Sequence, residues 1–160
     1  MIQTGILIIS LLISHSVYSN DIATDCRDYY YGVCLNEVSI KDFDSYLELH
    51  KGNDEILIKA YQAIIWFLWA DYYINPLQKW KCFNKGKKNL DFLIDRNKNN
   101  TELRFLRLTI QNNLPKFLGY NNNTKEDTDF IYTKINKITD EDLQSRIVNY
   151  LYNSGIEKTN

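Results

Sequence analysis

Hydrophobic residues recur at helical spacing along most of the chain, and no pair of strands is indicated. Residues 42–51 set apolar side chains among acids and end at Gly52, which is typical of a short amphipathic helix. Residues 55–74 are apolar on nearly every side, and a helix of that kind is buried in protein or in lipid. Polar interruptions at Lys59, Gln62 and Asp71 favour the central helix of a bundle over a membrane segment.

Residues 75–120 predict a helix, a polar turn and a second helix. Pro76 suits the first turn of a helix over residues 77–94. Gly86 lies inside that helix and costs about 1 kcal/mol relative to alanine. We therefore expect a neighbouring helix backbone to approach closely at Gly86, and a tolerated surface glycine is the alternative. Asn100 or Thr101 is expected to cap the second helix.

Two further helices are expected near the C-terminus. One follows residues 124–127 and carries Phe130, Ile131 and Ile135, and Asp140 caps the last. The sequence thus predicts an all-α fold, a single compact bundle of five or six helices in residues 20–160, with its core at about residues 39–153. Acidic runs at 126–127 and 140–142 are interpreted as helix-start residues that complement the helix dipole.

The first 19 residues resemble a secretory signal peptide. Residues 5–13 form an apolar run of suitable length, and cleavage is expected after Ser19. The protein is then exported, periplasmic or secreted, with no transmembrane helix after cleavage; an uncleaved anchor is the alternative. All three cysteines lie in the exported part, and Cys26 with Cys34 is the nearest pair for one disulfide, leaving Cys82 as the odd thiol. Three reduced thiols are the other interpretation.

Charge and composition exclude several classes of function. The chain has 19 basic and 20 acidic residues, a net charge of −1, and no terminal block of one sign, so general nucleic-acid binding is not expected. Only His50 remains after signal cleavage, which excludes a His-rich metal site. No cofactor motif is present, and we expect neither a cofactor nor a metal.

Arg104 and Arg107 lie three residues apart on one face of a predicted helix. Their planar guanidinium groups could clamp a carboxylate or a phosphate. The alternative is that they pair with Asp or Glu of adjacent helices or cap loop carbonyls.

A lysine-rich segment with interleaved aromatic residues forms the second candidate site. This pattern fits an anionic lipid, glycan or nucleic acid, or else a solvated helix face in which Asp91 pairs with Lys87. Trp80 also belongs to an aromatic cluster with residues 66, 69, 72 and 73, which predicts either a ligand groove or core packing. The segment consists of Lys79, Trp80, Lys81, Phe83, Lys85, Lys87 and Lys88.

Several short stretches carry a resemblance to a known family. They are residues 75–76, 83–86, 90, 102–107 (Glu-Leu-Arg-Phe-Leu-Arg) and 117–120 (Phe-Leu-Gly-Tyr). The chain, most clearly over residues 61–151, resembles a family of small exported helical proteins of Bacteroidetes-type bacteria that has no assigned activity. The helix pair also resembles a degenerate tetratricopeptide unit, in which residues 97–100 stand where Asp-Pro-Asn-Asn is usual.

The function that these observations favour is an exported helical binding or scaffold module of the cell envelope, with a protein partner or another envelope component. One alternative is a small hydrolase-like enzyme, which predicts a cleft where Arg104 and Arg107 meet an acid of raised pKa. The other is a secreted inhibitor or effector that presents the face of residues 79–88 to an acidic partner. The pattern does not indicate an oligomeric state.

Overall fold

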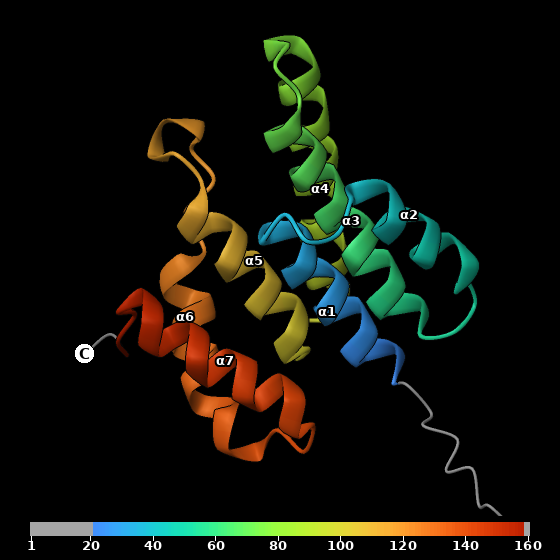
Figure 1. The fold of residues 1–160 in the computed structure, drawn as a ribbon. Helices are drawn as coiled ribbons and strands as arrows, with labels where there is room; N and C mark the ends of the chain where they lie inside the picture. The colour runs from blue at the N-terminus through green and yellow to red at the C-terminus, as the bar shows by residue number, and fades with distance from the viewer. Residues whose placement is uncertain (1–20, 159–160) are drawn as a thin grey trace, which may run out of the picture.

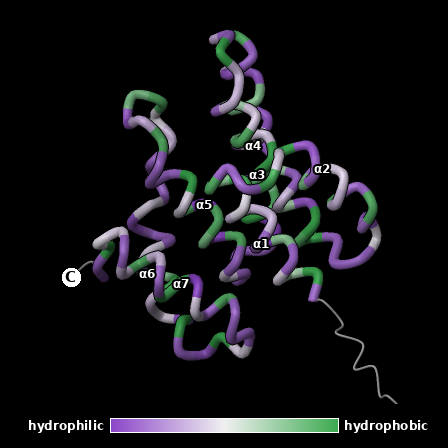
Figure 2. The backbone as a smooth tube through the Cα atoms, viewed as in Figure 1, coloured by the Kyte–Doolittle hydropathy of each residue, from purple (hydrophilic) through white to green (hydrophobic). Residues whose placement is uncertain are grey.

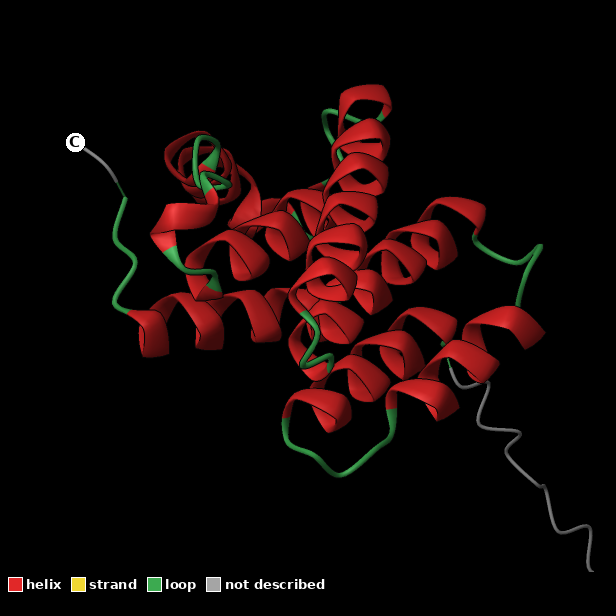
Figure 3. Ribbon diagram, turned by 90° about the horizontal axis from the view of Figure 1, so that it is seen from above, coloured by secondary structure: helices red, strands yellow, loops and turns green. Residues whose placement is uncertain are grey.

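The computed structural model describes residues 21–158, which form an all-α fold (Figure 1). Figure 3 shows only helices and loops in this part of the chain, with no strand. The elements are α1 (Ile22–Cys34), α2 (Ile40–Leu49), α3 (Glu55–Tyr72), α4 (Pro76–Arg96), α5 (Thr101–Asn113), α6 (Thr124–Lys134) and α7 (Glu141–Ser154), with short 3-10 segments η1 (Lys116–Leu118) and η2 (Ile135–Lys137).

The predicted helical class is confirmed, but the predicted number of five or six helices is too low, because α1 was not expected. Asp21 begins α1 by accepting a hydrogen bond from the Ala23 N–H at 3.2 Å. Cys26 and Arg27 of this helix are buried, so the core extends beyond its predicted start near residue 39. The predicted signal segment, with its cleavage site, lies outside the described residues.

The caps predicted at Asn100 and Asp140 are confirmed, and α3 and α4 begin in the same way. A side-chain oxygen at each start accepts a backbone N–H two or three residues later, and this satisfies a donor that the helix itself cannot pair. The caps are Asp54 for α3, Asn75 for α4, Asn100 for α5 and Asp140 for α7.

The helices α3 and α4 pack along each other as a long hairpin whose tip projects from the rest of the molecule (Figure 1). Gly86 of α4 lies where the two helices are closest. A Cβ atom there would lie 2.9 Å from ring carbons of Phe67 and 3.0 Å from the Ala63 carbonyl oxygen. The predicted close approach at Gly86 is therefore confirmed.

The most enclosed helix is α5, although α3 was the predicted centre of the bundle. Every residue from Glu102 to Gln111 is buried. Phe105 and Leu108 belong to an apolar cluster with α6 and α7, whereas Leu103 and Leu106 belong to the larger cluster formed with α1 to α4. Figure 2 shows hydrophilic and hydrophobic residues mixed along this helix, so α5 brings polar side chains into the interior.

The helix pair predicted in residues 75–120 is present as α4 and α5. However, α4 packs chiefly along α3, and α5 chiefly along α6. The resemblance of this helix pair to a tetratricopeptide unit therefore stays a prediction. No helix within residues 21–158 is long and apolar enough to cross a membrane.

Replacing Gly86 with alanine tests the close contact between α3 and α4. Alanine would gain about 1 kcal/mol of helix propensity, but overpacking costs about 1–3 kcal/mol. Because the nearest atoms include a backbone carbonyl, we expect the free energy of unfolding to fall. Urea denaturation measures it, with Asn89→Ala on the exposed face of α4 as the control, expected within about 0.5 kcal/mol of wild type. A Gly86→Ala variant more stable than wild type would contradict the contact.

Candidate functional site

Arg104 and Arg107 project from α5 toward α6, where they share one carboxylate. Arg104 Nη1 donates to Asp127 Oδ1 at 2.8 Å and to Glu126 Oε1 at 2.9 Å, and its Nε donates to the Lys98 carbonyl oxygen at 2.8 Å. Arg107 donates to both oxygens of Asp127, at 2.7 and 2.9 Å. Asp127 has 0% exposure and both arginines are buried, so the two guanidinium groups are closed off by the protein itself.

Tyr120 and Asp91 complete the arginine cluster. Arg107 Nη1 lies 3.4 Å from Asp91 Oδ1, which also accepts a hydrogen bond from the Tyr120 hydroxyl at 2.8 Å. Burial, and then the charge of Asp91, raise the pKa of Tyr120, so the hydroxyl keeps its proton. Asp91 is thus bound by Arg107 and Tyr120 rather than by Lys87.

These contacts decide between the two interpretations of the arginines. Each arginine is paired with acids, mainly of α6. This is the arrangement expected if the arginines do not clamp a ligand. A hydrolase-like cleft would need an acid of raised pKa here, whereas the hydrogen bond from Arg104 lowers the pKa of Glu126. The arginine cluster therefore gives no support to the enzyme alternative.

Asp127 is the residue whose second role was not predicted. It lies in the first turn of α6 together with Glu126, as expected, but its side chain and that of Ile131 one turn later are fully buried. The helical period indicates the burial of Asp127, because residues 127 and 131 lie on the same face of a helix. An acid on the apolar face of a helix requires a buried basic partner.

A second buried ion-pair network was not predicted. Arg27 of α1 forms two hydrogen bonds with Glu102 of α5, at 2.9 and 2.8 Å. It also binds Asp140 at 2.7 Å and Asp142 at 2.8 Å, which tie α1 to the start of α7. The Tyr61 hydroxyl of α3 donates to Glu102 at 2.9 Å. Within residues 21–158, no group of His, Cys, Asp or Glu is arranged to hold a metal ion.

The lysine segment is spread over the surface of α4. Lys85 Nζ lies 3.6 Å from the ring centroid of Trp66, and Lys87 Nζ lies 5.0 Å from that of Tyr120. Lys79 donates to the Asp71 carbonyl oxygen at 3.1 Å. The exposed members of the segment are Lys79, Trp80, Lys81, Lys85 and Lys88.

The aromatic cluster lies where the core meets the surface. The Trp69 ring contacts Tyr72 and Tyr73, with centroids 5.4 and 5.6 Å apart. Trp66 and Trp69 are half-buried, and Trp80 is exposed and stacks on Phe83 at 5.8 Å. Both roles considered for the cluster are present, because Trp69 packs against the main apolar cluster and also lines a groove together with Tyr72.

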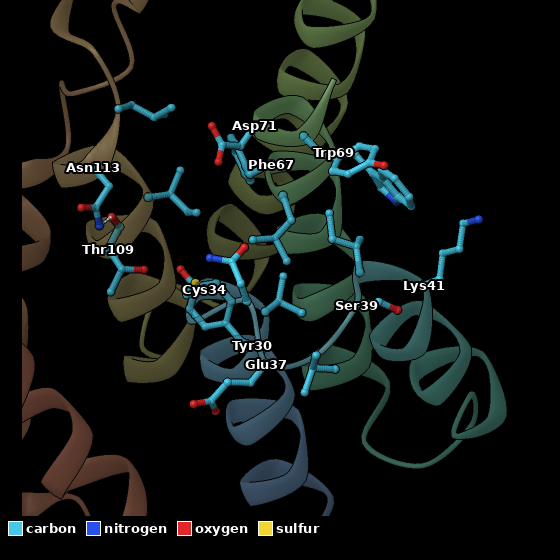
Figure 4. Close-up of a pocket in the computed structure, with 18 of the residues that line it drawn as sticks. Tyr30, Cys34, Glu37, Ser39, Lys41, Phe67, Trp69, Asp71, Thr109 and Asn113 are labelled. Atoms are coloured by element: carbon cyan, nitrogen blue, oxygen red, sulfur yellow. Dashed lines mark hydrogen bonds between the residues drawn. The ribbon is translucent and has the colours of Figure 1, made fainter. Parts of the chain in front are cut away.

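A groove of about 990 Å³ lies between α1, α3 and α5 (Figure 4). Its floor is apolar, with Phe67, Ile110 and the ring of Tyr30. Figure 4 shows Asp71 and Trp69 on the α3 side and Thr109 and Asn113 on the α5 side, with Cys34 and Tyr30 between them. The α1–α2 linker and the start of α2 line one end with polar residues, including Glu37 and Ser39 of the linker and Lys41 of α2.

A smaller groove of about 680 Å³ lies between α2, α3 and α4. Its aromatic residues include Trp66 and Phe92, but the protein's own cations already cover their rings. Lys85 lies over Trp66, and the Arg96 guanidinium lies 4.5 Å from the Phe92 ring centroid. The larger groove is therefore the better candidate for a partner.

The cysteines do not form the predicted disulfide. Cys26 and Cys34 both lie on α1, eight residues and about 12 Å apart along the helix axis, whereas a disulfide requires Cα atoms within about 7 Å. All three cysteines are free; Cys26 and Cys82 are buried, and Cys34 is exposed in the groove. Partial shielding of the Cys34 thiol from water raises its pKa, and a hydrogen bond with Tyr30 opposes that change.

No family model matches the chain, and no curated protein or solved structure was found to be similar to it. The resemblance to small exported helical proteins of Bacteroidetes-type bacteria therefore stays a prediction.

Asp127→Asn tests the central role of the shared carboxylate. This change removes the charge that neutralises two buried guanidinium groups, so we expect the protein to lose about 3–5 kcal/mol of unfolding free energy. Glu126→Gln is the matched control, because its carboxylate also binds Arg104 but is 61% exposed; we expect a loss below about 1 kcal/mol. Urea denaturation of both variants measures the difference, and equal losses would contradict the assignment.

The acids bound by arginine predict loss of stability in acid. Burial alone would raise the pKa of Asp140, but hydrogen bonds from Arg27 and from the Leu143 N–H outweigh it and lower the pKa; that of Glu126 is also lowered. A carboxyl group whose pKa is lower in the folded state than in the unfolded state stabilises the fold at pH values above its unfolded pKa. This stabilisation is lost as the pH falls through the folded-state pKa. We expect the unfolding free energy to drop below about pH 4.

Asp140→Asn provides the comparison for this pH dependence, because asparagine also caps helices but carries no charge. The midpoint of urea denaturation is measured at neutral and at acidic pH. Between these two conditions it should fall less in this variant than in wild type. Identical slopes would show that the pair between Arg27 and Asp140 does not contribute.

Proposed function

We propose that this protein is an exported, non-catalytic helical binding module of the cell envelope, and that a segment of a protein partner occupies the groove between α1, α3 and α5. The observation that carries the proposal is the anatomy of this groove. An apolar floor inside a polar rim is the arrangement found in protein–protein interfaces. Export follows from the predicted signal segment, and a groove between packed helices also suits the predicted tetratricopeptide-like character.

The dimensions and chemistry of the groove favour a peptide segment. At about 990 Å³ it is at the upper end of the range for small-molecule pockets. Its lining offers both donors and acceptors, including Glu37, Lys41, Asp71 and Asn113. Such groups can pair with the backbone of an extended chain while apolar side chains cover Phe67 and Ile110.

The enzyme alternative has less support. The arginines on which it depends are paired with Asp127, Glu126 and Asp91. The groove contains carboxylates from Glu37 and Asp71 but no arginine or histidine. A secreted inhibitor or effector remains compatible with the groove, since it would also act by binding a protein.

Cys34 allows a direct test of whether a partner binds in the groove. It is the exposed cysteine, while burial raises the pKa of Cys26 to about 12 and Cys82 is also buried. A bulky maleimide, applied at about pH 7, where lysine amines are protonated and a small fraction of thiolate is enough for reaction, should therefore attach to Cys34 first and fill the groove. Mass spectrometry of peptides would verify the position of the adduct.

The experiment compares capture of envelope proteins by the mature chain before and after this reaction. We expect a captured partner to be lost from the alkylated wild type and kept by Cys34→Ser protein treated in the same way. Thermal unfolding of the alkylated protein is the control for folding. Equal capture by the blocked and unblocked proteins, or no capture by the folded wild type, would contradict the proposal.

A further inference from the structure

Two projecting tips of the molecule carry exposed apolar side chains. One is the turn between α3 and α4, where Ile74 is 94% exposed and Tyr72, Leu77 and Trp80 are also exposed. The other is the η1 loop, where Phe117 is 86% exposed. Both tips project to the same side of the molecule, at the top of Figure 1. Water-facing side chains of this size are common singly, but such a set at two prominent points marks a contact surface.

Lysines outnumber acids in the sequence around both tips, although the exposed Asp71 directly precedes Tyr72 and Glu126 follows Lys125. Residues 72–90 contain five lysines and no Asp or Glu. Residues 114–125 contain Lys116 and Lys125 and again no acid. In a chain of net charge −1, this segregation makes the side with the tips locally cationic. The complementary surface must therefore be anionic as well as able to receive apolar side chains.

We propose that the tips, namely the α3–α4 turn and the η1 loop, dock on the surface of an anionic phospholipid bilayer. Ile74, Leu77 and Phe117 would enter the boundary between headgroups and acyl chains. Trp80 and Tyr72 suit that boundary, because their rings are apolar but carry a polar group. Lys79, Lys81 and Lys116 would lie at the headgroups. Apolar insertion together with basic residues is the two-signal combination that gives stable peripheral binding.

The positions of the tips fit a flat surface better than a pocket on another protein. The groove between α1, α3 and α5 separates them, since Tyr72 lines it on one side and Pro115 on the other. The molecule would therefore touch the bilayer at two separated points, with the groove opening between them. This inference does not depend on what occupies the groove.

Vesicle flotation of the mature chain from Asn20, which contains every described residue, tests the proposal. The probes are vesicles of phosphatidylcholine alone and of phosphatidylcholine mixed with phosphatidylglycerol. We expect binding only to the mixed vesicles, weakened at about 0.5 M salt, where the Debye length is a few Å. No binding to the mixed vesicles at low salt would overturn the proposal and leave the lysine face to an acidic protein partner.

Charge-matched variants locate the contact. Ile74→Asp combined with Phe117→Asp should weaken partition to mixed vesicles by about tenfold or more. Leu49→Asp combined with Tyr152→Asp is the control, since these side chains are 81% and 86% exposed but lie at the end of α2 and in α7, away from both tips; we expect a change within about twofold. Lys81→Gln with Lys116→Gln should also weaken binding, whereas Lys98→Gln with Lys137→Gln should not. Equal effects of the tip and control pairs would contradict docking by the tips.

Discussion

The structure depends on buried pairs between guanidinium and carboxylate groups along α5. Removing such groups from water costs several kcal/mol per ion, and only good geometry with further hydrogen bonds compensates for it. The protein meets this requirement twice. Asp127 accepts from Arg104 and Arg107, and Glu102 binds Arg27 through two parallel hydrogen bonds. Because these partners lie on α1 and α6, their geometry fixes how the two apolar clusters are placed around α5.

This architecture determines where function can be located. Side chains that looked chemically promising in the sequence, above all Arg104 and Arg107, are used to hold helices together. What remains open to partners is the surface: the groove that Cys34 and Asn113 line, and the tips that carry Ile74 and Phe117. The two proposals use different parts of that surface and can hold together, with the groove opening between the tips.

Much of the fold could be predicted from the sequence because its signals are local. Capping residues such as Asn100 and Asp140, and the close approach at Gly86, follow from backbone chemistry within one or two turns. The helix α1 was missed because its buried face includes Arg27 and Tyr residues rather than aliphatic ones. The helix α5 was predicted, but its burial on every side was not, because charged residues such as Glu102 and Arg104 are typical of a side that faces water.

The candidate site was predicted less well, since it depends on contacts between distant segments. The pairing of Arg104 and Arg107 with acids was foreseen as an alternative, but the burial of their partner Asp127, correctly expected at a helix start, was not. The groove joins residues from α1, α3 and α5, and no local pattern shows that they meet. Only the aromatic cluster around Trp69 and Tyr72, which lines one wall, indicated a groove in advance.

Native-state hydrogen exchange of the α5 amides tests the central claim most directly. If buried ion pairs make α5 the element on which both apolar clusters depend, amides from Leu103 to Ile110 should exchange only through global unfolding, as slowly as the slowest amides of α3. Exchange of α5 through local opening, at a lower free energy than that of α3, would contradict the account.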